Sequence, residues 1–329
     1  MKLLVTGGLG FIGSNFIIKL LSENDDFTII NVDAELYGSE KRNLSKFTNH
    51  PNYEFVKGNI TNKPLMEKLI TKSDAVINFA AESFVDRSIT NPNSFLVSNV
   101  RGTFTLLDII SKQKKRLVQI STDEVFGSLE SGSATEDSKL NPSNPYSATK
   151  AAAELLINSY YNTFNSDVVI TRCTNNYGPR QFAEKLIPKT FILAKQGKKI
   201  PIYGTGKNIR DWIFVDDHCD AVDLVLKNGK SGESYNISAN NEIDNLTVIK
   251  KILEMMNKSE DLIEFVEDRP GHDVRYSMDS TKITKNLNWN IKSNFEEGLQ
   301  KTIQWYETNP ELLNNLSTAL ESTPWKNSN

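Results

Sequence analysis

A single stretch decides the expected fold: Thr6-Gly7-Gly8-Leu9-Gly10-Phe11-Ile12-Gly13, which contains the spacing Gly8-x-Gly10-x-x-Gly13. It follows a short apolar run that predicts a strand, Leu3–Thr6, and it opens a segment with helical spacing, Phe11–Leu21. Glycines at this spacing permit a tight turn, let backbone N–H groups approach a pyrophosphate, and let helix and strand pack closely. The N-terminus of the helix then favours the anion. The stretch therefore predicts a dinucleotide site between the first strand and the first helix.

An acidic residue, Asp33, follows the next predicted strand, Thr28–Val32, and lies 20 residues past Gly13. A carboxylate there accepts hydrogen bonds from the ribose hydroxyls of NAD, and it repels the 2′-phosphate of NADP. The next residue is Ala34 rather than an Arg that could pair with that phosphate. We therefore expect NAD as the cofactor. The turn glycines expected to face it are Gly7, Gly10 and Gly13.

Apolar runs alternate with helical patterns along the first half of the chain. Strands are predicted at Leu3–Thr6, Thr28–Val32, Tyr53–Lys57, Ala75–Ala80, Leu117–Ser121 and Val168–Arg172. Helices are predicted at Phe11–Leu21, Lys63–Thr71, Ser94–Lys112 and Ser147–Phe164. This alternation predicts an α/β fold built on a Rossmann-like, doubly wound parallel sheet.

The pattern loosens after Asn175, where prolines and glycines punctuate a more irregular region. Helices are predicted there at Ile187–Gln196, Asp216–Lys227, Thr247–Met256 and Phe295–Thr308. We therefore predict an NAD-binding Rossmann domain at residues 1–175, which also carries the helix with Tyr146 and Lys150. A smaller, mixed C-terminal lobe at residues 176–329 is expected mainly to bind substrate, with the chain crossing between the two lobes.

Composition and charge exclude several other classes of protein. The chain has 38 Lys+Arg and 41 Asp+Glu, a formal net charge of −3. Mild acidity argues against a nucleic-acid partner, which would require clustered basic side chains. Two distant cysteines, Cys173 and Cys219, fit neither a disulfide framework nor a metal or redox motif. Since no stretch approaches the ~18 apolar residues of a membrane span and Met1–Val5 does not read as a signal peptide, we expect a cytoplasmic protein without a metal site or membrane segment.

Tyr146 and Lys150 are spaced i and i+4, which places both side chains on one face of the predicted helix. A nearby ammonium stabilises phenolate, so we expect the pKa of Tyr146 to lie below its usual value of ~10. This pair suits a base that acts on a sugar hydroxyl. Thr122 follows the strand Leu117–Ser121, at the carboxyl end where doubly wound sheets bind ligands. The three side chains therefore predict a catalytic site beside the dinucleotide.

Short motifs spread from Leu3 to about Tyr306 match one family. They are Val5–Gly13, Ala80-Ala81-Glu82-Ser83, Val85-Asp86-Arg87-Ser88, Ser121–Gly127, Tyr146–Lys150, Asn175–Pro179, Glu184–Pro188, Pro201–Gly204, Ile209–Trp212 and Asp268–Asp273. With these motifs the sequence resembles the extended short-chain dehydrogenase/reductase superfamily. Within it, the sequence is most similar to the sugar-nucleotide 4,6-dehydratases, nearest to those that act on dTDP-glucose. The triplet Thr122-Asp123-Glu124 and the block Arg269-Pro270-Gly271-His272 are the most specific of the motifs.

The resemblance implies a hydro-lyase that converts a nucleotide-diphosphate hexose, first of all dTDP-glucose, into its 4-keto-6-deoxy product. Tyr146, helped by Lys150 and Thr122, would take the C4 hydroxyl proton while the C4 hydride passes to NAD. Glu124 would remove the C5 proton, and Asp123 would protonate O6, which leaves as water. The hydride returns to C6 and the proton to C5, so NAD is regenerated and stays bound. Adjacent carboxyls can fill both roles where their surroundings push the two pKa values apart.

The binding residues of the family carry over position by position. The cofactor contacts so implied are Phe11, Ile12, Asp33, Asn59, Ile60, Ala80, Ala81, Ser98, Tyr146, Lys150 and Asn176. The substrate contacts so implied are Ser83, Thr122, Asn175, Lys185, Leu186, Pro201, Tyr203, Arg210, Asn245, Arg269 and His272. Arg210 and Arg269 suit a diphosphate, because guanidinium groups pair bidentately with its oxygens. The resemblance also implies a homodimer through a four-helix bundle, with Ser94–Lys112 and Ser147–Phe164 as the contributing helices.

Several positions depart from the family pattern. Phe84 stands where glucose-specific members have His, and Phe126 stands where they have Tyr. The run Arg180–Ala183 lacks the usual Pro before Glu184-Lys185, and the loop Gly127–Pro145 is shorter than usual. The acid and base residues are intact, so we expect the reaction class to be retained. The nucleobase and the group at C2 stay open, with UDP-N-acetylglucosamine and UDP-glucose as alternatives to dTDP-glucose.

Two other functions are compatible with the fold. A nucleotide-sugar 4-epimerase would use Thr122, Tyr146 and Lys150 but would have no need of the pair Asp123-Glu124. A dinucleotide-sensing module without enzyme activity would need neither Tyr146 nor Lys150. The presence of all five residues favours the dehydratase.

Overall fold

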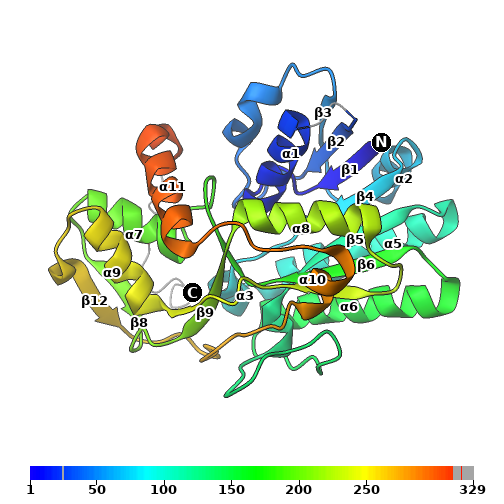
Figure 1. Ribbon diagram of the computed structural model, residues 1–329. Coiled ribbons are helices and arrows are strands. Elements are labelled where there is room, and N and C mark those ends of the chain that lie inside the picture. Colours follow the sequence, from blue (N-terminus) through cyan, green and yellow to red (C-terminus); the bar gives the residue numbers. More distant parts are fainter. Residues whose placement is uncertain (24–25, 314–319, 321–329) are drawn as a thin grey trace.

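The computed structural model describes residues 1–23, 26–313 and 320, and its centre is a parallel sheet (Figure 1). Seven strands pair in the order β10-β6-β5-β4-β1-β2-β3, and every neighbouring pair is parallel. They are β1 (Lys2–Thr6), β2 (Thr28–Asp33), β3 (Tyr53–Lys57), β4 (Ala75–Asn78), β5 (Arg116–Thr122), β6 (Val168–Cys173) and β10 (Ser234–Ile237). The predicted sheet is therefore confirmed. The strand order changes direction between β1 and β4, where such sheets bind ligands.

Helices cover both faces of this sheet. On one face lie α1 (Phe11–Glu23) and α8 (Val215–Asn228), and on the other lie α2 (Lys63–Thr71), α5 (Gly102–Gln113) and α6 (Pro145–Phe164). Strands enclosed in this way must be apolar nearly throughout, and Leu3, Leu4 and Val5 of β1 are fully buried. Leu3 and Val5 belong to the apolar core under α1 and α8, whereas Leu4 belongs to the core under α2 and α5. Side chains that alternate along β1 thus contribute to the apolar core on both faces of the sheet.

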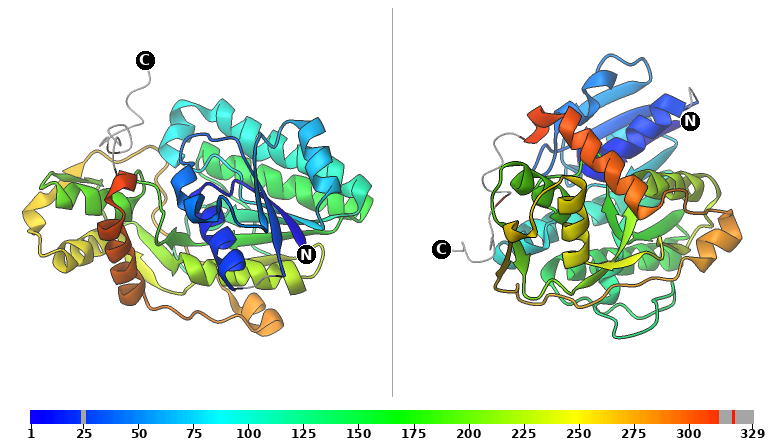
Figure 2. Two further views of the ribbon diagram at one scale, coloured as in Figure 1. Left: turned by 90° about the horizontal axis from the view of Figure 1, so that it is seen from above. Right: turned by 60° about the vertical axis from the view of Figure 1, so that its left-hand side comes forward.

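A smaller part of the chain lies beside the large sheet rather than over it, as the two views of Figure 2 show. It has a three-stranded sheet, β11-β9-β7, and a two-stranded sheet, β12-β8. Its strands are β7 (Asn175–Tyr177), β8 (Ile200–Tyr203), β9 (Ile209–Phe214), β11 (Glu242–Asp244) and β12 (Ile263–Val266), and its helices are α7 (Leu186–Lys195), α9 (Asn245–Met255) and α11 (Phe295–Thr308). Further short elements are α10 (Thr281–Leu287) and the 3₁₀ turns η1 (Lys41–Phe47), η4 (Glu260–Leu262) and η5 (Pro310–Leu313).

The chain returns from this smaller part to the large sheet. Strand β10 pairs with β6 through the register Ser234↔Ile170 to Ile237↔Cys173. Helix α8, which also follows residue 175, packs on α1. The division of the chain at residue 175 stays a prediction, and the edge of the large sheet is formed by residues from beyond that point.

The prediction of one continuous helix at Ser94–Lys112 is wrong, because the helix is interrupted. The segment is three consecutive pieces: α4 (Pro92–Phe95), a π-helical turn η2 (Leu96–Arg101) and α5. The π turn carries Asn99, whose amide Nδ2 donates to Thr149 Oγ1 at 2.9 Å and to the Glu82 carbonyl at 3.0 Å. At this wider helical turn, Asn99 therefore links the loop after β4 to α6, the helix that bears Tyr146.

The strand predicted at Ala75–Ala80 ends early, at Asn78. Beyond it the chain passes over the glycine turn, where Gly7 has a φ of +70°. A Cβ atom at Gly7 would lie 2.6 Å from the backbone of Ala80. The close approach of these two backbone segments requires glycine, and it opens the end of the sheet for a ligand.

No helix among the residues described here combines the length and the apolar character needed to cross a bilayer.

Candidate active site

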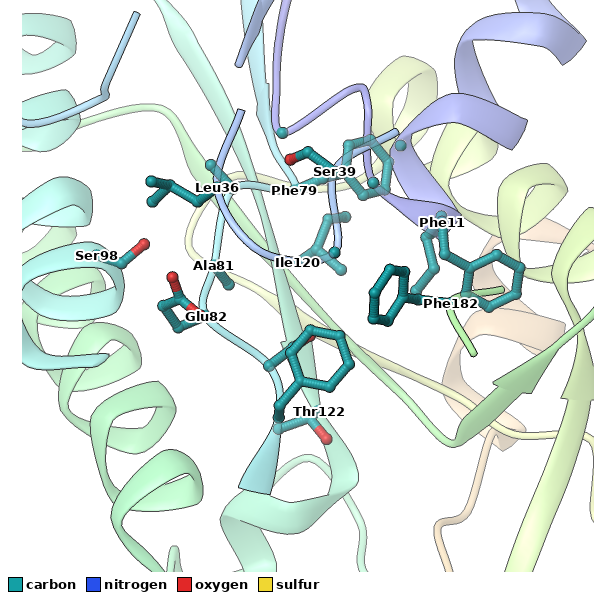
Figure 3. A pocket seen from close by; sticks show the side chains of 18 of the residues that line it. Phe11, Leu36, Ser39, Phe79, Ala81, Glu82, Ser98, Ile120, Thr122 and Phe182 are labelled. Atoms are coloured by element: carbon teal, nitrogen blue, oxygen red, sulfur yellow. The ribbon is translucent and has the colours of Figure 1, made fainter. Parts of the chain in front are cut away.

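One continuous pocket lies across the carboxyl ends of β1, β2, β4 and β5 (Figure 3). Every residue predicted to contact the cofactor lines it: Gly7, Gly10, Phe11, Ile12, Gly13, Asp33, Asn59, Ile60, Ala80, Ala81, Ser98, Tyr146, Lys150 and Asn176. Asp33 is buried, and its carboxylate accepts hydrogen bonds from Leu9 N at 3.0 Å and from Ser39 Oγ at 2.9 Å. These bonds join the glycine turn to the loop after β2. The fold therefore fixes the position of this carboxylate within the pocket.

The five residues predicted to be catalytic line the same pocket: Thr122, Asp123, Glu124, Tyr146 and Lys150. Thr122 is the last residue of β5, and Asp123 and Glu124 form the first turn of the 3₁₀ helix η3 (Asp123–Phe126). The Thr122 hydroxyl accepts a hydrogen bond from Glu124 N at 3.3 Å and donates one to Asp123 Oδ1 at 3.1 Å. One end of the parallel sheet thus presents a hydroxyl and two carboxyls to the pocket.

The two carboxyls have different surroundings. Only 3% of Asp123 is exposed, and its Oδ2 atom is buried without a hydrogen-bond partner in the structure. Burial, followed by the neighbouring charge of Glu124, raises the pKa of Asp123 well above its usual value. Glu124 is less buried and accepts a hydrogen bond from the Asn144 amide at 3.4 Å. These surroundings favour the protonated form of Asp123, which is the form that the acid of such a pair requires.

Tyr146 and Lys150 share one face of α6, which Asn144 begins with a capping box and Pro145 at its first position. Lys150 Nζ donates to the Ile120 carbonyl of β5 at 2.6 Å, and burial lowers the pKa of Lys150 to about 8. The expected lowering of the pKa of Tyr146 is wrong. Burial and the charge of Glu124 raise the pKa of Tyr146 instead, and the hydrogen bond with Thr122 only partly opposes them.

The burial of Lys150 can be tested by measuring the free energy of unfolding. Below about pH 8 the ammonium is charged in both states, and its lowered pKa costs the folded state up to ~3 kcal/mol. Between about pH 8 and 10.5 the folded chain releases the proton first, so the cost fades as pH rises. We expect Lys150→Met to raise the free energy of unfolding by about 1–3 kcal/mol near neutral pH, and by less at alkaline pH.

Urea unfolding of the ligand-free protein at both pH values measures this difference. The exposed Lys68 of α2 provides a matched control, because Lys68→Met removes a solvated ammonium and should change stability little. A gain for Lys150→Met that is equally large at both pH values would contradict a buried, charged Lys150.

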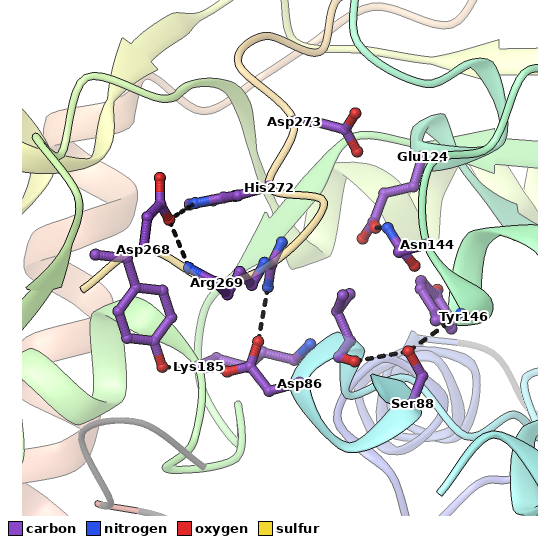
Figure 4. A network of polar contacts seen from close by, with 12 residues as sticks. Asp86, Ser88, Glu124, Asn144, Tyr146, Lys185, Asp268, Arg269, His272 and Asp273 are labelled. Carbon is purple, nitrogen blue, oxygen red and sulfur yellow. Dashed lines mark hydrogen bonds and ion pairs between the residues drawn. The ribbon is translucent and has the colours of Figure 1, made fainter. Parts of the chain in front are cut away.

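A second cluster of polar side chains continues from the pocket into the smaller part of the chain (Figure 4). Arg269 Nη1 donates to Asp86 Oδ1 at 3.0 Å, and the Tyr203 hydroxyl donates to Asp86 Oδ2 at 3.1 Å. Lys185, which also lines the pocket, donates to the Ser83 carbonyl at 3.0 Å. The carboxylate of Asp86 thus holds Tyr203, the last residue of β8, and Arg269, which lies in the loop after β12.

The other residues predicted to contact the substrate divide into those that line the pocket and those that lie outside its lining. Ser83 and Asn175 line the pocket, whereas Leu186, Pro201, Tyr203, Arg210, Asn245, Arg269 and His272 lie outside its lining. The guanidinium of Arg210 is buried, donates to the carbonyls of Ile209 and Asp273, and lies over the ring of Tyr276. His272 Nδ1 lies 2.6 Å from Asp268 Oδ1, and burial together with the charges of Arg269 and Arg210 lowers the pKa of His272 to about 4. The guanidinium groups of Arg210 and Arg269 therefore lie in this cluster together with the carboxylates of Asp86 and Asp268.

Three side chains that contact the site were not predicted from the sequence. Asp86 and Ser88 belong to the short helix α3 (Val85–Thr90), where Ser88 Oγ accepts a hydrogen bond from Tyr146 N at 3.2 Å. Asn144 contacts Glu124. Both α3 residues lie inside the motif Val85–Ser88, so that motif marked the segment although it did not assign their contacts.

Comparison with known proteins gives the family. A family model described as GDP-mannose 4,6-dehydratase matches residues 4–302 of the chain. The chain belongs to this family. The predicted resemblance to the sugar-nucleotide 4,6-dehydratases is thereby confirmed.

The chain is similar over nearly its whole length to three known proteins. The low-salt glycan biosynthesis protein Agl12 of Haloferax volcanii is 50% identical over 307 residues, which are 93% of this chain and 98% of that protein. The dTDP-glucose 4,6-dehydratase of Mycobacterium tuberculosis is 43% identical over 326 residues, which are 98% of each chain. The crystal structure of dTDP-glucose 4,6-dehydratase from Bacillus anthracis in complex with NAD is 47% identical, with a TM-score of 0.88, over 94% of this chain and 98% of that one.

Two departures from the dehydratase family have clear surroundings in the structure. Phe84 packs against the rings of Tyr37 and Phe182, and Lys185 Nζ lies 4.8 Å from its ring centre. Phe126 lies in a buried cluster, 4.9 Å below the guanidinium of Arg172. Phe84 therefore borders the pocket, whereas Phe126 belongs to the core behind it.

Proposed function

We propose that the chain is an NAD-dependent nucleotide-sugar 4,6-dehydratase whose substrate is dTDP-glucose. The observation that best supports this reaction is that the buried Asp123 lies beside Glu124, in one pocket with Tyr146 and Lys150. An epimerase does not need this pair of carboxyls, because it eliminates no water. The identity of the sugar follows from the relatives described above, several of which are dTDP-glucose 4,6-dehydratases.

The residues present fit an NAD molecule. The turn around Gly7 leaves no room for a side chain, and the Asp33 carboxylate is held at the ribose position. When bound, NAD would supply a temporary acceptor for the C4 hydrogen of the sugar and return it at C6. The protein's own residues then have to move protons and keep the sugar in place.

Tyr146 is the group that would accept the proton of the C4 hydroxyl. Burial raises its pKa, so it requires a positive charge nearby before it can act as a base. Lys150, on the next turn of α6, has a pKa of about 8 and can carry that charge at neutral pH. Thr122 hydrogen-bonds to Tyr146 and favours the phenolate further.

Asp123 and Glu124 would divide the elimination between them. The raised pKa of Asp123 favours the protonated carboxyl, which can donate to the departing O6. Glu124 is held by the Asn144 amide and is free to take the proton from C5, which the 4-ketone makes acidic. Arg210, Arg269 and Lys185 would pair with the diphosphate of the nucleotide.

Mass spectrometry tests this function. The purified protein is incubated separately with dTDP-glucose, UDP-glucose and UDP-N-acetylglucosamine, and each mixture is searched for loss of one water. We expect the loss with dTDP-glucose, and none when Asp123→Asn and Glu124→Gln are combined. Loss only from a UDP sugar would keep the reaction and overturn the substrate. A change at C4 without loss of water would establish the epimerase instead.

The two helical segments predicted to form a dimer carry exposed apolar side chains. Leu96 of η2 is 53% exposed, Phe104 of α5 is 46% exposed, and Leu155 of α6 is 61% exposed. Helices α5 and α6 pack against each other. Large apolar side chains on neighbouring helices indicate a surface that a partner covers. We therefore propose a homodimer in which these helices of two copies form a four-helix bundle, and we expect the enzyme to act in the cytoplasm.

Charged substitutions test the proposed dimer. Combining Phe104→Glu with Leu155→Glu should convert the dimer into monomers, because each charge would be buried at the interface. Sedimentation velocity measures the change. Phe265 of β12 is similarly exposed, at 57%, so Phe265→Glu is the matched control and should leave the dimer intact. A wild-type chain that sediments as a monomer would contradict the proposal.

A further inference from the structure

We propose that Tyr37, Arg87 and Glu184 form a clasp that closes the dinucleotide pocket and sets the rate at which NAD leaves it. The inference rests on the proposed NAD-dependent function. It concerns residues that take no part in the proposed proton transfers.

The three clasp residues come from segments far apart in the sequence. Tyr37 lies in the loop after β2, Arg87 in α3, and Glu184 in the segment before α7. The Tyr37 hydroxyl donates to Glu184 Oε2 at 2.5 Å, and Arg87 Nε donates to the same oxygen at 3.1 Å. The guanidinium carbon of Arg87 lies 3.4 Å from the centre of the Tyr37 ring. Each clasp residue therefore contacts both of the others.

Burial strengthens these contacts. Only 7% of the Glu184 side chain is exposed, so its pairing with Arg87 is little screened by solvent. Burial, together with the neighbouring Glu184, raises the pKa of Tyr37, so the phenol stays protonated and continues to donate. A hydrogen bond to a buried carboxylate is among the stronger kinds in proteins.

Aromatic rings extend the clasp along the edge of the pocket. The Tyr37 ring centre lies 5.1 Å from that of Phe84 and 4.9 Å from that of Phe182. Gly38 has a φ of +87°, and a Cβ atom there would lie 2.9 Å from the Phe84 ring. Tyr37, Gly38, Phe84 and Phe182 all line the dinucleotide pocket. The loop after β2 is thus seated on the opposite wall with no space left for a side chain at Gly38.

The course of this loop explains why it would retain the cofactor. It starts at Asp33, the carboxylate expected to bind the ribose, and Ser39 returns to that carboxylate with a hydrogen bond of 2.9 Å. Between these two residues the loop reaches across to Glu184, on the other side of the pocket. NAD enclosed under this loop cannot leave until Tyr37 separates from Glu184. An enzyme that regenerates its cofactor in each cycle gains from such retention.

Release of NAD from the holoenzyme tests the clasp. Protein saturated with NAD is transferred to cofactor-free buffer, and the NAD still bound is measured by chromatography at intervals. We expect Tyr37→Phe to speed release about tenfold, because one hydrogen bond to a buried carboxylate is lost. Tyr37→Ala also loses the ring contacts and should speed release about a hundredfold or more. Tyr235→Phe is the matched control, since it loses a hydrogen bond with Lys230 N in the core, away from the clasp.

Two comparisons keep the outcomes distinct. In the double variant Tyr37→Phe, Glu184→Gln, the two effects should not add, because both substitutions break the same contact. Release of NAD at the wild-type rate from Tyr37→Phe and from Tyr37→Ala, with the thermal midpoint of the apoprotein preserved, would overturn the clasp alone. A wild-type chain that takes up no NAD would overturn the proposed function and the clasp with it.

Discussion

Replacing Tyr146 by Phe is expected to lower kcat about 10²–10⁴-fold. The substitution removes a single hydroxyl from a residue that is 8% exposed, and it leaves the packing of α6 intact. In the proposed mechanism this phenol accepts the C4 hydroxyl proton, with Lys150 one turn away and Thr122 as its hydrogen-bond partner. Binding of NAD and of the nucleotide sugar should change little, because other residues provide most of their contacts.

Steady-state kinetics with dTDP-glucose, and direct binding of the sugar nucleotide, measure the two effects separately. Tyr160→Phe, on the same helix but outside the lining of the pocket, is the matched control and should retain activity. A variant Tyr146→Phe that keeps more than about a tenth of wild-type kcat would show that another group removes the proton.

Replacing Asp123 by Asn is expected to stop the loss of water while the earlier steps continue. Asn has nearly the same shape but cannot donate an acidic proton to O6, so kcat for the complete reaction should fall about 10²–10⁴-fold. Glu124 remains and can still remove the C5 proton. The sugar nucleotide should therefore exchange its C5 hydrogen with solvent although it keeps its hydroxyl at C6.

Proton NMR in deuterated water measures both signals, the C5 exchange and the 6-deoxy product. Glu124→Gln provides the complementary variant, because it should lose the exchange as well as the elimination. Normal formation of the 6-deoxy sugar by Asp123→Asn would contradict the assignment of Asp123 as the acid. A loss of exchange in Asp123→Asn would show that the two carboxyls act only as a unit.

The sheet and its glycine turn could be predicted because their causes are local. The turn around Gly7 needs residues without side chains, and a strand buried on both faces needs the apolar run Leu3–Val5. The π-helical turn Leu96–Arg101 could not be predicted in this way. It is associated with the contacts of Asn99 to Glu82 and Thr149, which lie 17 and 50 residues away in the sequence.

The contacts within the candidate site could likewise be predicted only in part from the sequence. The spacing of Tyr146 and Lys150 places them on one helix face, but it does not show how deeply they are buried. Burial reverses the expected direction of the pKa shift of Tyr146, and Lys150 is held by the carbonyl of Ile120 rather than by the phenol. The contact of Asp86 with Arg269 joins residues 183 positions apart. Such contacts follow from the tertiary fold and leave no periodic signal in the sequence.

The return of β10 to the large sheet constrains how this enzyme can be recombined with its relatives. A chimera that exchanges everything after residue 175 also exchanges β10 and α8, so β6 and α1 would have to pack against foreign partners. An unmatched β6 would expose the edge of the sheet to aggregation. Crossovers that retain α8 and β10, and graft only the segments between and after them, keep the parental sheet whole. New sugar preferences are therefore more readily obtained from grafted loops than from a joined C-terminal half.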